Sequence, residues 1–299
     1  MEFMHGTGVA VVTPFDRTGN VDFPSLKKII DHLIDGGVEY LVALGTTGES
    51  ATLTADEQAK VIETFIEHNA GRVPMVLGAG GNNTVAVVEK VKQFTEKYQP
   101  AAILSVSPYY NKPTAKGLLA HYKAVAGATD VPVILYNVPG RTASNIPAEV
   151  TLELAHEVPN IVAVKEASGS LDQCMTIVRE KPEDFLLVSG DDGLTLPMMS
   201  IGGVGVISVI GNALPRPFTD MVRAALANEW EKARELHYQL FPLMNLNFAE
   251  GNPAGVKQLM ALQGICEKGV RLPLVEASQD LAEQMQLEFE KLPGAFGIK

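Results

Sequence analysis

A lysine follows an apolar run in the segment NIVAVKEASGS, where a charged amine is least expected. The run at 161–164 predicts a strand that is buried on both faces, as strands of parallel sheets are. Burial disfavours the ammonium form of Lys165, so either a partner holds its charge or the pKa of the amine falls. An uncharged lysine amine is a nucleophile, which a surface cation is not.

Two interpretations of Lys165 follow from the residues around it. In the first, it is a structural lysine paired with a carboxylate such as Glu166. Successive strand residues face opposite sides of a sheet, so this pairing is a weak explanation. In the second, it is a reactive amine, and Tyr136 at the end of the preceding apolar run supports that interpretation. A phenol beside an amine can shuttle the protons that carbinolamine and imine formation require.

Polar residues close other apolar runs as well, and each has a structural alternative. GTTGES (45–50) offers hydroxyl and backbone N–H donors to a small carboxylate, or it is a turn that leads into a helix. Arg141 in YNVPGRT presents a planar fork that suits a carboxylate ligand, or it forms a solvated ion pair. The adjacent Tyr109 and Tyr110 in SPYYNKP are typical of packing or interface residues.

Several other chemistries lack the residues they need. Asp191 and Asp192 in SGDD are expected either to cap the following helix or to act in catalysis. The six histidines are scattered without metal-ligand spacing, so a metal-dependent aldolase is disfavoured. GAGGNN lacks the third glycine of a dinucleotide fingerprint, and the sequence contains neither a phosphate-binding loop nor a G-x-S-x-G elbow.

Composition excludes further classes of function. The formal net charge of −11 argues against nucleic acid or an anionic membrane as a partner, and 46% hydrophobic residues indicate a globular protein with a large core. The two cysteines, Cys174 and Cys266, do not suggest a disulfide framework, and a reducing cytoplasm fits them best. We find no signal-peptide pattern and no segment long enough to span a membrane.

Eight short apolar runs recur along the chain, each followed by a segment with helical spacing. The runs lie at 8–15, 39–45, 74–80, 101–107, 132–138, 161–167, 185–192 and 203–210. Thr54 and Glu57 form a capping box, and Pro147 stands near another helix start. Eight such units predict a (β/α)8 TIM barrel, with a doubly wound open sheet as the alternative. We expect the catalytic barrel over residues 1–229 and a helical extension packed on it over residues 230–299.

The motifs GTTGES, PYYNKP, YNVPGRT, VAVKEAS and GVGVISV stand in this order at the expected strand ends. Together they resemble the dihydrodipicolinate synthase/N-acetylneuraminate lyase family, from about Gly6 through NPAGVK near residue 257. The resemblance implies a cofactor-free class I aldolase that condenses pyruvate with L-aspartate 4-semialdehyde to give 4-hydroxy-tetrahydrodipicolinate, in the diaminopimelate route to lysine. It also implies a cytoplasmic homo-oligomer, commonly a dimer of dimers.

The same resemblance implies four catalytic residues. Lys165 would form the Schiff base with pyruvate, and Tyr136 would donate and accept protons. Thr46 and Tyr110 would connect Tyr136 to solvent, with Tyr110 reaching across from a neighbouring subunit. A relay of hydroxyls moves protons without placing a fixed charge in the pocket.

Three further positions match substrate-binding residues of the family. Thr47 and the backbone at Ile207 would hold the carboxylate and imine region of pyruvate, and Arg141 would meet the carboxylate of the aldehyde. Sialic-acid and sugar-acid lyases resemble the chain around the lysine and tyrosine but typically lack its PxRT arrangement, and they form the alternative function. A non-catalytic ligand-sensing barrel and a pyridoxal-phosphate barrel are further alternatives.

Regulation by lysine is a point where the chain departs from part of the family. Members inhibited by lysine bind it in an interface pocket near the loops after the second and third strands. Four residues fit that pocket: Ser50, Ala51, Asn82 and Tyr109. Ala55 and Gln58 replace the histidines of sensitive members, and Ala86 replaces an acidic residue. A ligand ammonium without its carboxylate partner binds poorly, so we expect weak or absent inhibition.

Overall fold

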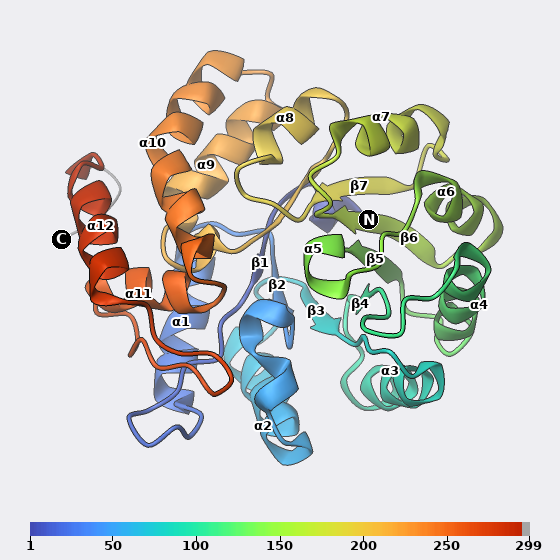
Figure 1. Cartoon of the computed structure of the whole chain (residues 1–299), viewed down its shortest axis with the longest axis horizontal. Helices are drawn as coiled ribbons and strands as arrows, with labels where there is room; N and C mark the ends of the chain where they lie inside the picture. Colours follow the sequence, from blue (N-terminus) through green and yellow to red (C-terminus); the bar gives the residue numbers. More distant parts are fainter. Residues whose placement is uncertain (295–299) are drawn as a thin grey trace. The chain divides into compact units, whose positions relative to one another are not determined.

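The structure, a computed structural model, describes residues 1–294 of the chain. Its sheet is a closed barrel of eight parallel strands in chain order, and helices follow the strands (Figure 1). The strands are β1 (Gly6–Ala10), β2 (Tyr40–Ala43), β3 (Met75–Gly78), β4 (Ala102–Val106), β5 (Val133–Asn137), β6 (Ile161–Glu166), β7 (Leu186–Ser189) and β8 (Gly205–Ser208). This confirms the (β/α)8 prediction, and the alternative of an open, doubly wound sheet is wrong.

Helices alternate with the strands and then continue to the end of the described chain. Those up to the last strand are α1 (Phe23–Asp35), α2 (Ala55–Asn69), α3 (Thr84–Tyr98), α4 (Ala115–Ala126), α5 (Pro139–Thr142), α6 (Ala148–Glu157), α7 (Leu171–Glu180) and α8 (Thr195–Ser200). After β8 come α9 (Pro215–Leu226), α10 (Trp230–Ala249), α11 (Ala254–Leu262) and α12 (Gln279–Glu290). The short 3₁₀ turns are η1 (Glu2–Met4), η2 (Thr46–Gly48), η3 (Ser50–Thr52) and η4 (Ile210–Asn212).

Helix starts follow the capping signals that the sequence carries. The Thr54 hydroxyl accepts from the backbone N–H of Glu57, and the Glu57 carboxylate accepts from the backbone N–H of Thr54, so the predicted capping box at α2 is confirmed. Pro147 is the N-cap residue of α6, where its missing N–H removes no helical hydrogen bond.

The chain divides into two compact units. The first unit contains residues 1–5 and 74–207, and the second contains residues 6–73 together with the chain from residue 208 onward. The expected division into a barrel over 1–229 and an extension over 230–299 stays a prediction, and residues 295–299 of that extension lie outside the described part.

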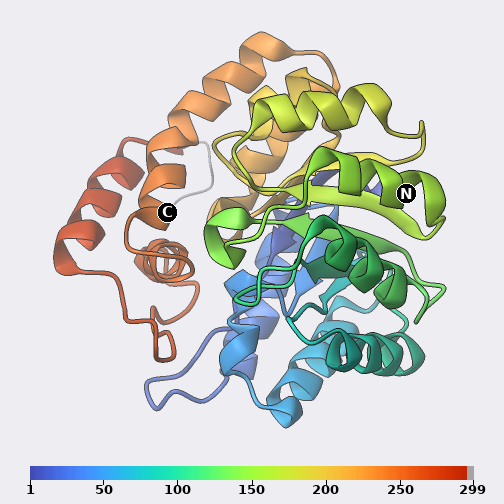
Figure 2. The same cartoon turned by 45° about the vertical axis from the view of Figure 1, so that its right-hand side comes forward.

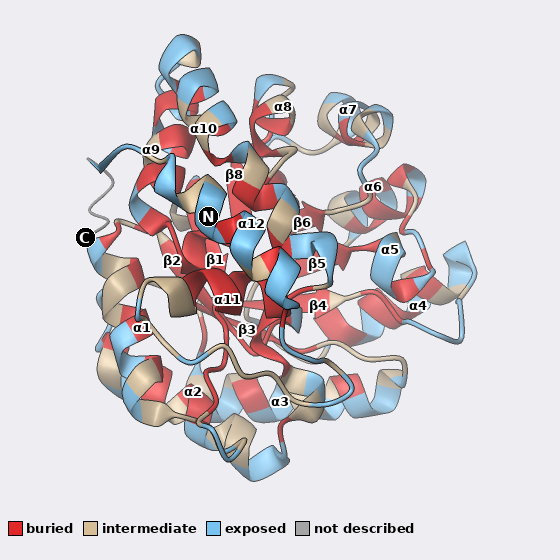
Figure 3. Ribbon diagram, turned by 60° about the vertical axis from the view of Figure 1, so that its left-hand side comes forward, coloured by how far each residue is buried: buried red, intermediate tan, exposed pale blue. Residues whose placement is uncertain are grey.

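In the first unit, strands β4 to β7 are parallel, and their register brings one residue of each strand to the same height in the sheet. Val106 of β4 is the register partner of Tyr136, and Tyr136 is the partner of Lys165. Lys165 is in turn the partner of Val188 of β7. The strands are buried along almost their whole length, as Figure 3 shows, which confirms the two-faced burial expected of parallel strands. Helices α3, α4, α6 and α7 pack against one another in chain order.

In the second unit, the helices after β8 pack on one another. Helix α10 contacts α9, α11 and α12, and the three last helices lie side by side in Figure 2. Leu240, Leu243 and Met244 of α10 are buried among these helices. Within residues 1–294, no helix combines the length and apolar character that crossing a membrane requires.

Candidate active site

Lys165 lies near the C-terminal end of β6 and is only 4% exposed. Its Nζ atom stands 4.2 Å from the centre of the Tyr136 ring, on the adjacent strand β5. The expectation that the two residues occupy neighbouring strands is therefore confirmed. Gly190 packs against the lysine stem, because a Cβ atom built there would lie 3.0 Å from Lys165 Cε. The amine is thus held in a fixed position against an aromatic face.

The charge state of Lys165 reflects this burial. Desolvation lowers the pKa of its amine to about 7, the negative charge of Asp192 opposes that shift, and the positive charge of Arg141 adds to it. At neutral pH a large share of the amine is consequently uncharged. An uncharged amine at the C-terminal end of a barrel strand is able to attack a carbonyl carbon.

Glu166, the partner considered for a purely structural Lys165, lies on the other face of β6. Its carboxylate accepts hydrogen bonds from the side chains of Asn137 and Gln173 and from the backbone N–H of Ser168. The interpretation of Lys165 as an ion-pair partner of Glu166 is therefore wrong, for the reason that strand alternation supplies.

Arg141 belongs to the same unit and is exposed on α5, a helix of four residues that Pro139 opens. Thr142 fixes this short helix, since its hydroxyl donates to the backbone oxygens of Val138 and Ser144. The chain leaves α5 through Ala143 in the left-handed conformation, with φ of 54°. Arg141 is near enough to Lys165 to lower the pKa of that amine, so its guanidinium carries positive charge to the same site.

Asp191 and Asp192 follow β7, and Ile207, whose backbone the resemblance assigns to pyruvate binding, lies within β8. Asp191 accepts from the backbone N–H of Leu194 at 3.1 Å, which is a turn interaction ahead of α8. Asp192 is buried, and its charge acts on Lys165. Ile207 is fully buried in β8. The sequence left capping and catalysis open for the two aspartates, and the structure separates them by their surroundings.

Tyr110 is exposed, whereas Tyr136 is buried. Tyr110 lies in the loop after β4, its backbone is left-handed with φ of 71°, and its side chain is 87% exposed. Tyr109 beside it is 44% exposed. Asn111 ties the loop to the loop after β3 by donating to the backbone oxygen of Asn82. The structure therefore presents Tyr110 at the surface of this chain.

Thr46 and Thr47 lie in the second unit, in the turn η2 that follows β2. Thr47 is buried, and its hydroxyl accepts a hydrogen bond from the Asn252 side chain at 2.9 Å. The backbone oxygen of Gly48 accepts from the Thr13 hydroxyl at 2.7 Å. These bonds connect the GTTGES turn to the segment that follows β1 and to the segment before α11, so the turn is anchored from two sides.

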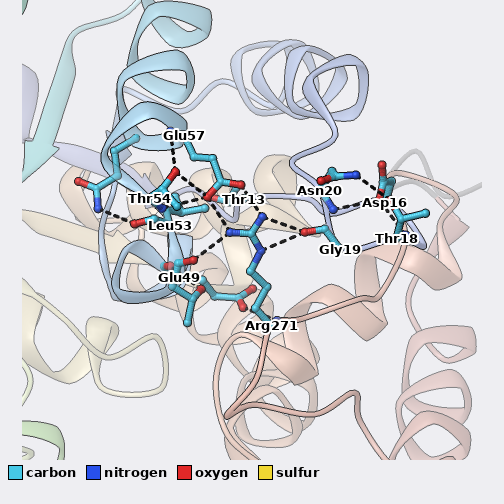
Figure 4. A network of polar contacts seen from close by, with 12 residues as sticks. Thr13, Asp16, Thr18, Gly19, Asn20, Glu49, Leu53, Thr54, Glu57 and Arg271 are labelled. Carbon is cyan, nitrogen blue, oxygen red and sulfur yellow. Dashed lines mark hydrogen bonds and ion pairs between the residues drawn. The ribbon is translucent and has the colours of Figure 1, made fainter.

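A buried ion pair anchors the end of the same turn. Lys257 Nζ lies 2.5 Å from Glu49 Oε1, both side chains are almost fully buried, and the backbone N–H of Arg271 donates to the other oxygen of Glu49. Figure 4 shows the Arg271 guanidinium reaching Glu57 and the backbone oxygen of Gly19. Sequence reasoning missed this network.

Metal ligands do not gather at the site. In the part of the chain that the structure describes, no three histidine, cysteine, aspartate or glutamate side chains cluster as a metal centre would require. In the first unit, the chemistry available around Lys165 comes from an amine, a phenol and a guanidinium.

Comparisons with known proteins find relatives over nearly the whole chain. The sequence profile of the Dihydrodipicolinate synthetase family matches residues 4–292. The 4-hydroxy-tetrahydrodipicolinate synthase of Flavobacterium psychrophilum is 51% identical over 98% of this chain and 99% of its own length. That of Koribacter versatilis is 48% identical over 99% of this chain and 97% of its own.

Solved structures are similar over nearly the whole chain. The dihydrodipicolinate synthase of Thermotoga maritima superposes with a TM-score of 0.94 at 38% identity, covering 99% of both chains. The chloride-inhibited enzyme of Acinetobacter baumannii, solved as a complex with pyruvate, has a TM-score of 0.93 at 36% identity and covers 99% of this chain and 100% of its own.

Proposed function

The chain belongs to the Dihydrodipicolinate synthetase family, and we propose that Lys165 and Tyr136 carry out its chemistry in this chain. The activity is that of a 4-hydroxy-tetrahydrodipicolinate synthase, a lyase. The observation that supports our assignment is the contact between a buried amine with a pKa of about 7 and the ring of Tyr136. A sialic-acid lyase, a ligand-sensing barrel and a pyridoxal-phosphate barrel are no longer needed as alternatives.

The first substrate is pyruvate, which the related Acinetobacter baumannii enzyme holds in its structure. The uncharged amine of Lys165 adds to the keto carbon of pyruvate and forms a carbinolamine. Tyr136 donates a proton to the departing hydroxyl, and one water leaves as the imine forms. Tyr136, deprotonated by that step, then takes a proton from the pyruvate methyl carbon and an enamine forms, whose carbon is the nucleophile of the next step.

The second substrate is L-aspartate 4-semialdehyde. The enamine carbon attacks its aldehyde carbon, a carbon–carbon bond forms, and the aldehyde oxygen takes up a proton. The amino group of the substrate then attacks the imine carbon, closes the ring and displaces Lys165, so the whole reaction releases one water. We assign Arg141 to the carboxylate of the aldehyde substrate, because its guanidinium is exposed on α5 and its charge reaches Lys165.

The remaining assignments concern proton transfer and binding of pyruvate. Thr46 and Tyr110 connect Tyr136 to solvent, while Thr47 and the backbone at Ile207 hold pyruvate. The anchored GTTGES turn supports a binding role for Thr47, whose hydroxyl is fixed by Asn252. We further propose that the chain forms a cytoplasmic homo-oligomer, a dimer of dimers. The exposure of Tyr110 supports the part of this proposal in which Tyr110 acts in a neighbouring subunit.

Borohydride reduction in the presence of pyruvate tests the central assignment. We expect intact mass analysis to find a single adduct and peptide mass analysis to place it on Lys165. The matched control is Lys257→Met, which removes the other buried lysine and should leave the adduct in place in the folded fraction. An adduct on another lysine, or none in the wild type, contradicts the assignment.

A further inference from the structure

Glu166 follows Lys165 directly and is a buried carboxylate held by neutral groups. It is 1% exposed. Asn137 Nδ2 lies 3.1 and 3.0 Å from its two oxygens, Ser168 N lies 2.7 Å from Oε1, and Gln173 Nε2 lies 2.7 Å from Oε2. Burying a carboxylate is costly unless such bonds compensate, and bonds to an ionised acceptor are the strong kind. The carboxylate is therefore a point at which three segments are held together.

The orientation of the donors is fixed by their other hydrogen bonds. Asn137 is fully buried, and its Oδ1 accepts from the backbone N–H of Ile146 at 2.9 Å, so its amide nitrogen faces Glu166. Gln173 Oε1 accepts from Asn145 at 2.9 Å, which turns the Gln173 nitrogen to the carboxylate as well. Both amide nitrogens are consequently directed to the carboxylate as donors.

The position of this cluster relates it to the proposed active site. Asn137 is the register partner of Glu166, exactly as Tyr136 one residue earlier is the register partner of Lys165. Because strand residues alternate in direction, the Asn137–Glu166 pair fastens β5 to β6 on one face, while the phenol and the amine meet on the other. The backbone of Glu166 also accepts from Gly190 of the next loop at 2.8 Å.

We infer that Glu166, Asn137 and Gln173 are positioning residues that hold the Lys165 amine against the Tyr136 ring. The inference rests on the proposed function, because it assigns the cluster to the imine-forming pair. A buried carboxylate needs its donors at fixed distances, so the ends of β5 and β6 cannot slide or twist apart without losing those bonds. Hydrogen bonds on the outer face of the two strands thereby fix the distance between the Lys165 amine and the Tyr136 phenol on the inner face.

Glu166→Gln tests this with almost no change in side-chain volume. A glutamine must place its NH₂ group against at least one of the donors, so the cluster opens. We expect kcat to fall roughly 10- to 100-fold, with a smaller change in KM for pyruvate, because misplacement of a reacting group slows the chemical step. We also expect slower reductive trapping of pyruvate, with its apparent pKa shifted upward as the amine becomes better hydrated.

Asn160→Ala is the matched control, because it weakens the opposite end of the same strand. The Asn160 side chain donates to the backbone oxygens of Ala126 and Thr129, just before β6 begins. This substitution should lower Tm. It should leave kcat and the trapping profile, which is the pH dependence of the rate of reductive trapping of pyruvate, unchanged. If Glu166→Gln likewise lowers Tm but keeps the wild-type kcat and trapping profile, the positioning role is refuted.

A second variant keeps the test decisive if Glu166→Gln fails to fold. Gln173→Ala removes one donor from a half-exposed position, and we expect a several-fold lower kcat with the same upward shift in the trapping profile. Wild-type values for this variant refute the inference. A wild type without a Lys165 adduct instead contradicts the proposed function, which separates the two failures.

Discussion

Two lysine side chains are buried among residues 1–294, one in each compact unit, and their surroundings differ. Lys257 of the second unit lies 2.5 Å from Glu49 and donates to the backbone oxygen of Gly269 at 2.9 Å. Lys165 of the first unit rests on the face of Tyr136, and Asp192 only partly offsets the desolvation of its amine. Burial lowers the pKa of both amines, and Glu49 opposes that shift at Lys257.

The contrast shows that burial alone does not make a lysine reactive. At Lys257 the short ion pair with Glu49 opposes the lowering of the pKa, because losing the proton would leave the Glu49 charge buried without compensation. An amine that is desolvated without such a pair loses its proton easily and becomes a nucleophile. We therefore propose a structural role for Lys257 and a catalytic role for Lys165, and variants of the two lysines test this difference.

The largest effect is expected from Lys165→Met. Methionine keeps an apolar stem of similar length but cannot form an imine, so turnover should fall by roughly 10³-fold or more. Steady-state assay of the purified, folded variant checks this. Turnover within about tenfold of the wild type would mean that another amine carries the reaction.

The next largest effect concerns stability: replacing Lys257 and replacing Lys165 should change the free energy of unfolding in opposite directions. Lys257→Met leaves Glu49 buried without its cation, so the free energy of unfolding should fall by about 3 to 5 kcal/mol. Lys165→Met removes a desolvated amine, and the free energy of unfolding at pH 7 should rise by up to ~4 kcal/mol. Urea unfolding of both variants and the wild type measures these changes.

The stability difference at Lys165 should also depend on pH. The unfolded chain holds this proton up to the ordinary lysine pKa of 10.5, whereas the folded chain releases it near pH 7. The unfolded state thus binds more protons across that window, and the stability of the wild type rises with pH there. The advantage of Lys165→Met should be complete below pH 7 and disappear above the ordinary pKa. A constant advantage from pH 6 to 10 would contradict the lowered pKa.

Arg141→Ala should separate the two substrates. Because we assign Arg141 to the aldehyde substrate, kcat/KM for L-aspartate 4-semialdehyde should fall by roughly 10²-fold, as loss of a charged bond to a carboxylate does. Reductive trapping of pyruvate on Lys165 should persist, with its apparent pKa slightly raised because a nearby cation is gone. Equal loss of both activities would undermine this role.

The smallest effect is expected from added lysine. Gln58 of α2 donates from its amide nitrogen to the backbone oxygens of Ser50 and Leu53, so this side chain is already hydrogen-bonded to the segment before its helix. We expect no inhibition of this chain at sub-millimolar lysine in a steady-state assay. Inhibition in that range would overturn the expectation.

The sequence predicted the surroundings of Lys165 better than those of Lys257. Eight apolar runs, each followed by a segment with helical spacing, predicted the barrel. Tyr136 and Lys165 end consecutive runs, so they were expected on neighbouring strands, as the structure has them. The Lys257–Glu49 pair joins residues 208 positions apart, and no spacing rule connects them. The contact between Asn137 and Glu166 was not predicted either, because strand order indicates which strands are neighbours but not which of their side chains form hydrogen bonds.

The pH dependence of imine formation shows whether Lys165 reacts as an uncharged amine at neutral pH. The rate at which wild-type Lys165 captures subsaturating pyruvate can be followed by quenching with cyanoborohydride and measuring intact mass across the pH range. We predict a rise with pH whose midpoint lies near 7, as the buried amine loses its proton. A midpoint near the ordinary lysine value of 10.5 would show that the amine stays charged at neutrality, and would contradict the account.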